Sequence, residues 1–338
     1  MEKTLYTFTK NGYDDFIDFI KGLAIVLVVL EHTIPFRQQL LFPIWGASKA
    51  VPIFLVIQMF HAFKRGQPRI PNVKKVFDRI LKPFIIIQVL LLIVNIAVSA
   101  DTINMVIYKT LRGGGMGPGS YYPWIYIQFA LILPFMYKAL NRYDLKKLFI
   151  ICLAMSFAIE VLCSLIDMPE RLYRVLALRY MFLVYFGIEW CRKGIYLSNR
   201  GIILGTIGLC AVIFFNYFYA PLEPLFFETG WKSDRWITFL FVMYIYVPVI
   251  YLIYQKLSCK IVKIFKHLGK ASFEIFLCQM FICHIIKPDV VGHFIDNPVF
   301  KWLLYLVLTI PTSIYCGLYW YKTKTKAENA GNNNGKKQ

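Results

Sequence analysis

Residues 18–35 read DFIKGLAIVLVVLEHTIP, an apolar run with charged residues near both ends. With the apolar residues just before it, this run is long enough to cross a hydrocarbon core of roughly 30 Å as a helix. Lys21, Glu31 and His32 nevertheless lie within it. An ionisable group at mid-depth costs about 2.5–3.5 kcal/mol, so each needs an explanation. The stretch predicts a membrane helix that carries functional groups.

Similar apolar stretches recur along all 338 residues, of which 58% are hydrophobic and 17% charged. A soluble domain has roughly 45–50% apolar and about 25% charged residues. We predict ten spans, at residues 16–36, 45–63, 80–100, 121–140, 148–167, 174–192, 201–221, 236–256, 269–287 and 298–320. The sequence therefore predicts an all-α polytopic membrane protein, a bundle of about ten transmembrane helices. Residues 1–321 form one integral domain, and residues 322–338 a disordered basic cytoplasmic tail.

The formal net charge of +19 is distributed as in a membrane protein and does not indicate nucleic-acid binding. If the N-terminus is cytoplasmic, 24 of the 38 lysines and arginines lie at inner ends of spans and 10 at outer ends. This asymmetry is the positive-inside rule, and with ten spans it predicts both termini in the cytoplasm. Anionic lipid accounts for the basic rim, so we expect a multi-pass protein of a cell membrane, a bacterial inner or plasma membrane. No nucleic-acid partner is expected.

The eight cysteines indicate no metal site. They are scattered, most of them inside apolar spans, and none forms a CxxC pair. A free cysteine in such a position acts as a small hydrophobic residue. We therefore expect no bound metal and no disulfide framework.

Lys21 and His32 are eleven residues apart, which is informative for a helix. At 100° per residue they differ by about 20° in direction and are separated by roughly 16.5 Å along the axis. They therefore share one face, with the cation near the cytoplasmic rim and the imidazole toward the outer half. Glu31 points about 100° away, and could reach the same cavity from the side or pair with a cation on another span. The alternative is a histidine that is merely interfacial.

The third span opens with a basic cluster that could bind an anion. Arg79 and Lys82 are three residues apart and so share a helical face at the cytoplasmic end. With Lys21 they could surround an anion that enters from the cytoplasm. Ordinary positive-inside anchoring is the alternative.

Three further polar residues lie inside predicted spans. Arg179 is expected to be a structural ion-pair partner, of Glu160 or Glu31, or to line a cavity. Ser272 and Gln279 share one face of the ninth span, where they could contact an acceptor or only bond to a neighbouring helix.

The segment 101–120 ends in LRGGGMGPGS and is predicted to lie outside as a flexible or re-entrant loop. The aromatic residues that follow it, Tyr121, Tyr122, Trp124 and Tyr126, are typical of an interfacial belt. They could also form a lid or a stacking platform for a sugar.

Four segments together resemble the membrane-bound acyltransferase family 3. The first span of that family typically reads D-x-x-R-G with a histidine ten residues beyond the Arg, and here Asp18-x-x-Lys21-Gly22 precedes His32. Its second-span pattern, a Pro before a Phe-rich run, resembles VPIFLVI at residues 51–57. Its basic R-x-x-R entry to span three resembles Arg79-x-x-Lys82. Its Leu-Gly-Lys-x-Ser-aromatic segment resembles LGKASF at residues 268–273. The resemblance covers residues from about 14 to 320 and implies a ten-helix membrane domain.

The chain departs from the family pattern at several positions. Lys21 and Lys82 stand where the family has Arg, which keeps the charge and loses bidentate phosphate geometry. Gln279 replaces a common histidine, and Ile57-Gln58 replaces a common Ser-Gly.

The resemblance implies transfer of an acyl group, with acetyl the expected one, from cytoplasmic acyl-CoA to a hydroxyl of a cell-surface sugar or polysaccharide. Acyl-CoA is then a co-substrate, and no permanently bound cofactor is expected. Lys21, Arg79 and Lys82 would meet the CoA phosphates. His32, beside Glu31, would act as general base or accept the acyl group itself. Proteins of a surface-glycan pathway would be its partners.

Two other functions remain open from the residues alone. In a multi-pass transporter or flippase, for a polysaccharide precursor or a small solute, Glu31, His32 and Arg179 would form a proton or substrate path. A non-catalytic membrane module that binds a ligand is the third. A transporter would show Gly- or Pro-interrupted helices in both halves, and the sequence shows no such pair.

Overall fold

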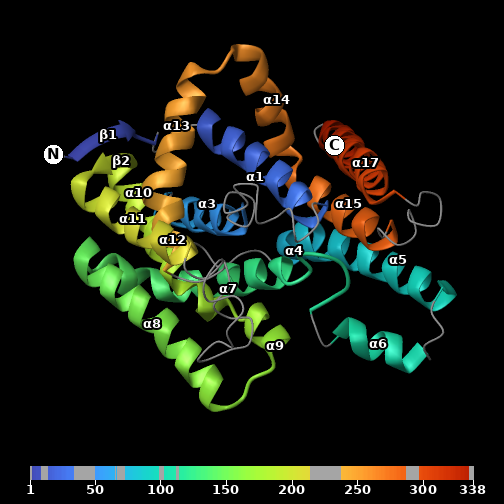
Figure 1. The fold of residues 1–338 in the computed structure, drawn as a ribbon, viewed down its shortest axis with the longest axis horizontal. Helices are drawn as coiled ribbons and strands as arrows, with labels where there is room; N and C mark the ends of the chain where they lie inside the picture. The colour runs from blue at the N-terminus through green and yellow to red at the C-terminus, as the bar shows by residue number, and fades with distance from the viewer. Residues whose placement is uncertain are drawn as a thin grey trace.

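The computed structural model is a mostly helical molecule (Figure 1). It describes residues 2–8, 14–33, 50–64, 66, 73–98, 103–111, 114–213, 237–286 and 297–334. The elements are β1 (Glu2–Tyr6), α1 (Asp15–Thr33), α3 (Ala50–Lys64), α4 (Val73–Val76), the π turn η2 (Phe77–Leu81), α5 (Lys82–Val98), α6 (Ile103–Leu111), α7 (Tyr122–Asn141), α8 (Leu145–Leu165), α9 (Glu170–Val175), the 3₁₀ turn η3 (Ala177–Tyr180), α10 (Met181–Lys193), β2 (Ile195–Ser198), α11 (Asn199–Ile213), α12 (Thr238–Phe241), the π turn η5 (Val242–Tyr246), α13 (Val247–Lys256), α14 (Cys259–Lys270), α15 (Ser272–Ile285) and α17 (Pro298–Asn334).

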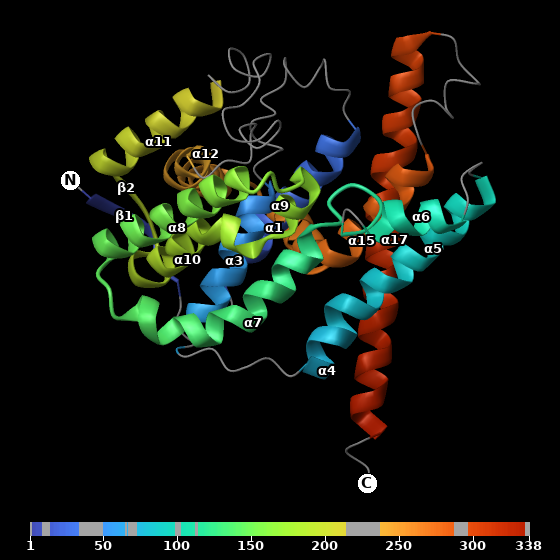
Figure 2. The same ribbon diagram turned by 90° about the horizontal axis from the view of Figure 1, so that it is seen from below.

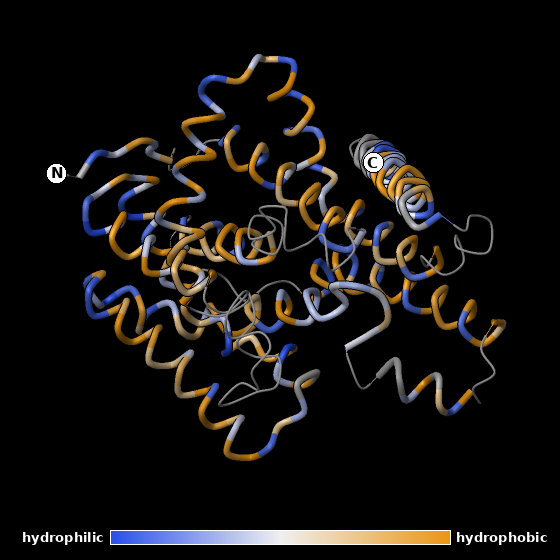
Figure 3. The backbone as a smooth tube through the Cα atoms, in the orientation of Figure 1, coloured by the Kyte–Doolittle hydropathy of each residue, from blue (hydrophilic) through white to orange (hydrophobic). Residues whose placement is uncertain are grey.

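The outer helices carry the apolar surface expected of lipid-facing spans. Large hydrophobic side chains are exposed along one side of α5, α8 and α17, among them Ile93, Leu165 and Val307. Figure 3 shows apolar residues along most of α5 and α8. An apolar surface of this extent is stable only against lipid or another protein. The chain is thus a multi-pass membrane protein.

Of the ten expected spans, the structure supports five or six by length and composition among the described residues. Five helices are long and apolar enough to cross a membrane, Val73–Val98, Tyr122–Asn141, Leu145–Leu165, Thr238–Lys256 and Phe300–Ala327. A bent pair, α14 with α15, raises the number to six, and α3 is a shorter apolar helix. Helix α1 is not among these candidate spans because four charged residues lie on it. Helix α10 is not among them because it has only 13 residues. The outer part of the expected span 201–221 lies outside the described residues. The cytoplasmic location of the termini stays a prediction.

Helix α1 lies at the centre of the bundle. It contacts α3, α13, α14, α15 and α17, and most of its apolar side chains are buried. Figure 1 shows α13 and α14 as a helical hairpin whose second arm lies along α1. The charged residues of this central helix are therefore surrounded by neighbouring helices.

Two π turns each precede a proline. In η2 the N–H of Lys82 donates to the carbonyl of Phe77, and Pro83 is the next residue. In η5 the N–H of Val247 donates to the carbonyl of Val242, and Pro248 is the next residue. A proline has no N–H to continue an α-helical ladder and clashes with the carbonyl four residues earlier. The wider turn accommodates this, and π turns are frequent at functional sites.

The last helix is much longer than the others. α17 runs for 37 residues, from Pro298 to Asn334, or about 55 Å at 1.5 Å per residue. Figure 2 shows it extending beyond the remaining helices. It contains the expected span 298–320 and continues past residue 321, where the membrane domain was expected to end. An ion pair of 2.8 Å between Lys324 and Glu274 joins its last part to α15.

Candidate active site around helix α1

Lys21 and His32 lie on one unbroken helix, as their spacing requires. α1 is continuous from Asp15 to Thr33, and His32 lies in its last turn. Lys21 forms an ion pair of 2.5 Å with Asp18, one turn earlier. His32 and Glu31 are both half-buried. The helix therefore connects a cation at its start to an imidazole at its end.

Two glycines of the motifs quoted above, far apart in sequence, meet at the crossing of α1 and α14. A Cβ atom added to Gly22 would lie 2.7 Å from the carbonyl carbon of Phe265 and 3.1 Å from the nitrogen of Gly269. One added to Gly269 would lie 2.8 Å from the carbonyl carbon of Asp18. Because both residues lack a side chain, the two backbones approach closely. The segment after Leu268 thus packs directly on the segment that begins at Asp18.

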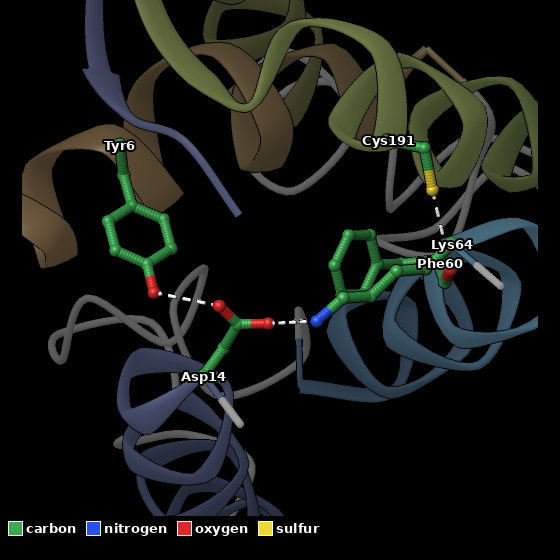
Figure 4. A network of polar contacts seen from close by, with 5 residues as sticks. All are labelled: Tyr6, Asp14, Phe60, Lys64 and Cys191. Carbon is green, nitrogen blue, oxygen red and sulfur yellow. Dashed lines mark hydrogen bonds and ion pairs between the residues drawn. The ribbon is translucent and has the colours of Figure 1, made fainter. Parts of the chain in front are cut away.

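A polar network holds the start of α1 against two other segments (Figure 4). The Tyr6 hydroxyl donates to Asp14 at 3.0 Å, and Lys64, at the end of α3, forms an ion pair with the same carboxylate. The Lys64 ammonium also lies 5.4 Å from the centre of the Phe60 ring. Nearby, the Cys191 thiol donates to the Phe60 carbonyl. Burial, and then the Asp14 carboxylate, raise the pKa of Tyr6. No sequence pattern indicates this network, because its members are too far apart in the chain.

A two-stranded antiparallel sheet anchors the N-terminus to the end of α10. β1 pairs with β2, with Lys3 opposite Leu197. Both strands lie on the side that the charge pattern predicts to be cytoplasmic. Their pairing is consistent with that prediction.

Arg79 and Lys82 are exposed and lie at η2 and the first residue of α5. Arg79 is close enough to Tyr126 of α7 to interact with it electrostatically. Because a π turn replaces the α-helix here, the expectation of a shared face, drawn from α-helical spacing, does not follow from the backbone. Both side chains remain accessible to an anion.

Arg179 is buried in η3, and its guanidinium lies 4.6 Å from the centre of the Tyr173 ring and 5.1 Å from that of Tyr180. Such contacts stabilise a cation inside a protein. η3 packs on α8, the helix that carries the buried Glu160. A structural role for Arg179 therefore has more support than contact with an acceptor.

The glycine-rich loop folds back onto the bundle. Gln88 of α5 donates to the carbonyl of Met116 at 3.0 Å and accepts from its N–H at 2.6 Å. Gly117 has a φ of 84°, a conformation that favours glycine, and lies against Met280 of α15. The Tyr122 ring then packs between Phe54 of α3, at 6.2 Å, and Phe276 of α15, at 5.7 Å. Two of the helices that contact this segment, α3 and α15, are also neighbours of α1.

Gln279 is a fully buried residue of α15, and neither atom of its amide has a hydrogen-bond partner among the described residues. The weakly polar thiol of Cys283 is near enough to interact with it. A buried amide without partners costs about 1–3 kcal/mol and calls for an explanation such as a bound molecule. Ser272 is the first residue of α15, at a bend of 71° between α14 and α15. These positions support the expected cavity-lining role of Gln279 more than that of Ser272.

His284 has a polar partner that the sequence did not suggest. Its Nε2 atom lies 3.1 Å from Nδ2 and 3.2 Å from Oδ1 of Asn95. Asn95 also contacts the sulfur of Met116 in the glycine-rich loop. Within the described residues no group of three His, Cys, Asp or Glu side chains could hold a metal ion.

A family model described as "Acyltransferase domain" matches residues 14–318. The matched range begins at the Asp14 ion pair and includes α1, the glycine crossing and most of α17. No curated protein and no solved structure matches the chain.

Proposed function

The chain belongs to this acyltransferase family, and we propose that it transfers an acyl group, most simply acetyl, from cytoplasmic acyl-CoA to a hydroxyl of a cell-surface sugar. The convergence of the motif segments on α1 is the observation that carries the proposal. Gly22 and Gly269 are in direct backbone contact, and one helix joins Lys21 to His32. Acyl transfer across a membrane requires such a connection between a cationic entrance and a deep base.

The donor would bind at the cytoplasmic end. Lys21, Arg79 and Lys82 supply charge-assisted donors to the phosphates of CoA. The roughly 16.5 Å between Lys21 and His32 along α1 is comparable to the reach of a pantetheine arm. The thioester of a CoA held at the rim would therefore come near the imidazole.

His32 would be the catalytic residue. A sugar hydroxyl is a poor nucleophile at neutral pH, and a general base typically accelerates its attack by about 10²–10⁴-fold. The hydroxyl proton passes to the imidazole, the oxygen forms the new ester bond, the C–S bond of the thioester breaks, and the imidazolium returns its proton to the leaving CoA thiolate. The acyl group could instead rest on His32 before it reaches the sugar. Glu31 would orient or pair with the ring, while Gln279 and the glycine-rich loop are the groups best placed to line the acceptor side.

The test is acyl transfer by the full-length protein in nanodiscs, with surface glycans of producing cells analysed in parallel for O-acyl groups by mass spectrometry. His32→Ala and His32→Gln should abolish transfer and keep acyl-CoA binding, because neither side chain can take up the proton. His267→Ala, which removes an exposed histidine of α14, is the matched control and should transfer normally. Near-normal transfer by a well-folded His32→Ala protein would refute the mechanism.

A further inference from the structure

A second cavity lies away from α1, between α8, α10, β2, α11 and η5. Its volume is about 530 Å³, within the range of small-molecule sites. None of these elements carries a residue of the proposed donor site. The cavity is lined mainly by aromatic and charged side chains, none of which belongs to the proposed acyl-transfer site.

The floor of the cavity is a buried carboxylate held by three phenols. Glu189 is 3% exposed, and the hydroxyls of Tyr185, Tyr196 and Tyr244 all donate to its Oε1 atom, the last two at 2.7 and 3.2 Å. Tyr244 reaches this position from the π turn η5. Three elements thus cooperate to satisfy one buried charge, which gives the floor a fixed geometry.

The rim carries three cations, Lys146, Lys193 and Arg200, from three different elements. Lys193 lies 4.9 Å from the centre of the Tyr196 ring. Neither Lys146 nor Arg200 forms an ion pair with another side chain in the described part of the chain. These three cations outnumber the two carboxyl groups of the lining, Asp144 and Glu189, so the positive charge prevails and favours an anion.

The carboxylate of Asp144 at the same rim is already engaged. It accepts a hydrogen bond of 2.8 Å from the backbone N–H of Lys147 and so caps α8. That bond lowers the pKa of Asp144. Arg192 donates to the carbonyl of Tyr143 at 2.8 Å, which fixes the loop before α8 against α10. The wall that carries Lys146 is thus held in place without a ligand.

We propose that this cavity binds a phosphate ester, with the phosphate between Lys146, Lys193 and Arg200 and the organic part over the aromatic floor. The cavity lies at the predicted cytoplasmic ends of α8, α10 and α11. Basic pockets between membrane helices on this side are suited to anionic lipid head groups. A soluble ester such as a nucleotide offers the same phosphate chemistry, and the experiment separates the two sources.

The experiment measures binding of phosphatidylglycerol, by native mass spectrometry of the delipidated full-length protein, and of CoA, by calorimetry. The variant is Lys146→Gln with Arg200→Gln, which removes two exposed charges and should not disturb folding. The matched control is Lys147→Gln with Lys260→Gln, which removes two exposed lysines outside the cavity. We expect the first variant to bind phosphatidylglycerol at least tenfold more weakly, while the control and the CoA affinities stay unchanged.

If the Lys146→Gln and Arg200→Gln variant loses CoA binding and keeps lipid binding, the cavity binds a soluble phosphate ester. Equal binding of both ligands by wild type, variant and control would overturn the proposal. His32→Ala should bind phosphatidylglycerol like the wild type, so the outcome does not depend on the acyl-transfer mechanism.

Discussion

Replacement of Gly22 by Ala tests the crossing of α1 and α14. The new Cβ would lie 2.7 Å from the carbonyl carbon of Phe265, whereas carbon atoms in contact are normally about 3.5–4.0 Å apart. The partner atoms belong to the backbone and cannot turn away as a flexible side chain would. The two helices would therefore have to separate by about 1 Å.

The size of the effect follows from two opposing terms. Alanine is favoured over glycine in a helix by about 1 kcal/mol, while overpacking typically costs about 1–3 kcal/mol and occasionally more. With backbone on both sides of the contact we expect the upper end of that cost and a net loss of roughly 2 kcal/mol. For a chain of this size that corresponds to a fall of roughly 3 °C in the midpoint of thermal unfolding.

Thermal unfolding of the purified protein in detergent, followed by tryptophan fluorescence, measures this fall. Gly201→Ala in α11 is the matched control, because its Cβ would meet only side-chain atoms, the Ser198 hydroxyl at 3.1 Å and the Tyr244 ring at 3.4 Å. Its midpoint should stay close to that of the wild type. If Gly22→Ala unfolds at or above the wild-type temperature, the backbones do not approach as described.

Three further predictions concern the surroundings of α1. Lys64→Met removes the ammonium from the buried Asp14 carboxylate and should lower the free energy of unfolding by about 3 kcal/mol. Adding Asp14→Asn to this variant should restore part of the lost stability. Unchanged stability of the single variant would show that the ion pair is dispensable. Gln88→Ala removes both hydrogen bonds to the Met116 backbone, so hydrogen exchange of the glycine-rich loop should accelerate, and unchanged protection would contradict the described packing. A cysteine at Lys326, in a chain whose own cysteines are replaced, should react with an impermeant maleimide only after cells are opened; labelling in intact cells would place α17 in the opposite orientation.

The sequence predicted the course of α1 and the family, but not how the helices around α1 pack. Hydrophobic periodicity and helical spacing are local properties, so one helix with Lys21 near its start and His32 near its end followed from the residues alone. The motif order also indicated the family correctly. The contact of Gly22 with Gly269 could not be derived in the same way, because it depends on how helices separated by most of the chain pack together.

The ten expected spans are supported only in part, because a hydropathy criterion selects helices that are long and apolar throughout. The central helix α1 carries charges that its neighbours shield, and so it does not meet this criterion. Nor does hydropathy show that Pro83 and Pro248 convert the preceding turns to π geometry, or that α14 and α15 meet at a bend of 71°. Transporters of inverted-repeat architecture have interrupted helices in both halves of the chain. Among the described helices, the one bent pair, α14 with α15, lies in the second half.

The position of His32 depends on contacts at the opposite end of its helix. The Asp14 ion pair with Lys64 and the crossing at Gly22 both act on the first turns of α1. Because α1 is unbroken, a sideways displacement of its first turns is carried to its last turn, where His32 lies. A shift of about 1 Å at Gly22 would move the base by a similar amount, and misplacement on that scale can cost about 10²-fold in rate. Gly22→Ala should therefore reduce acyl transfer more than its loss of stability explains, even at temperatures where the protein is fully folded.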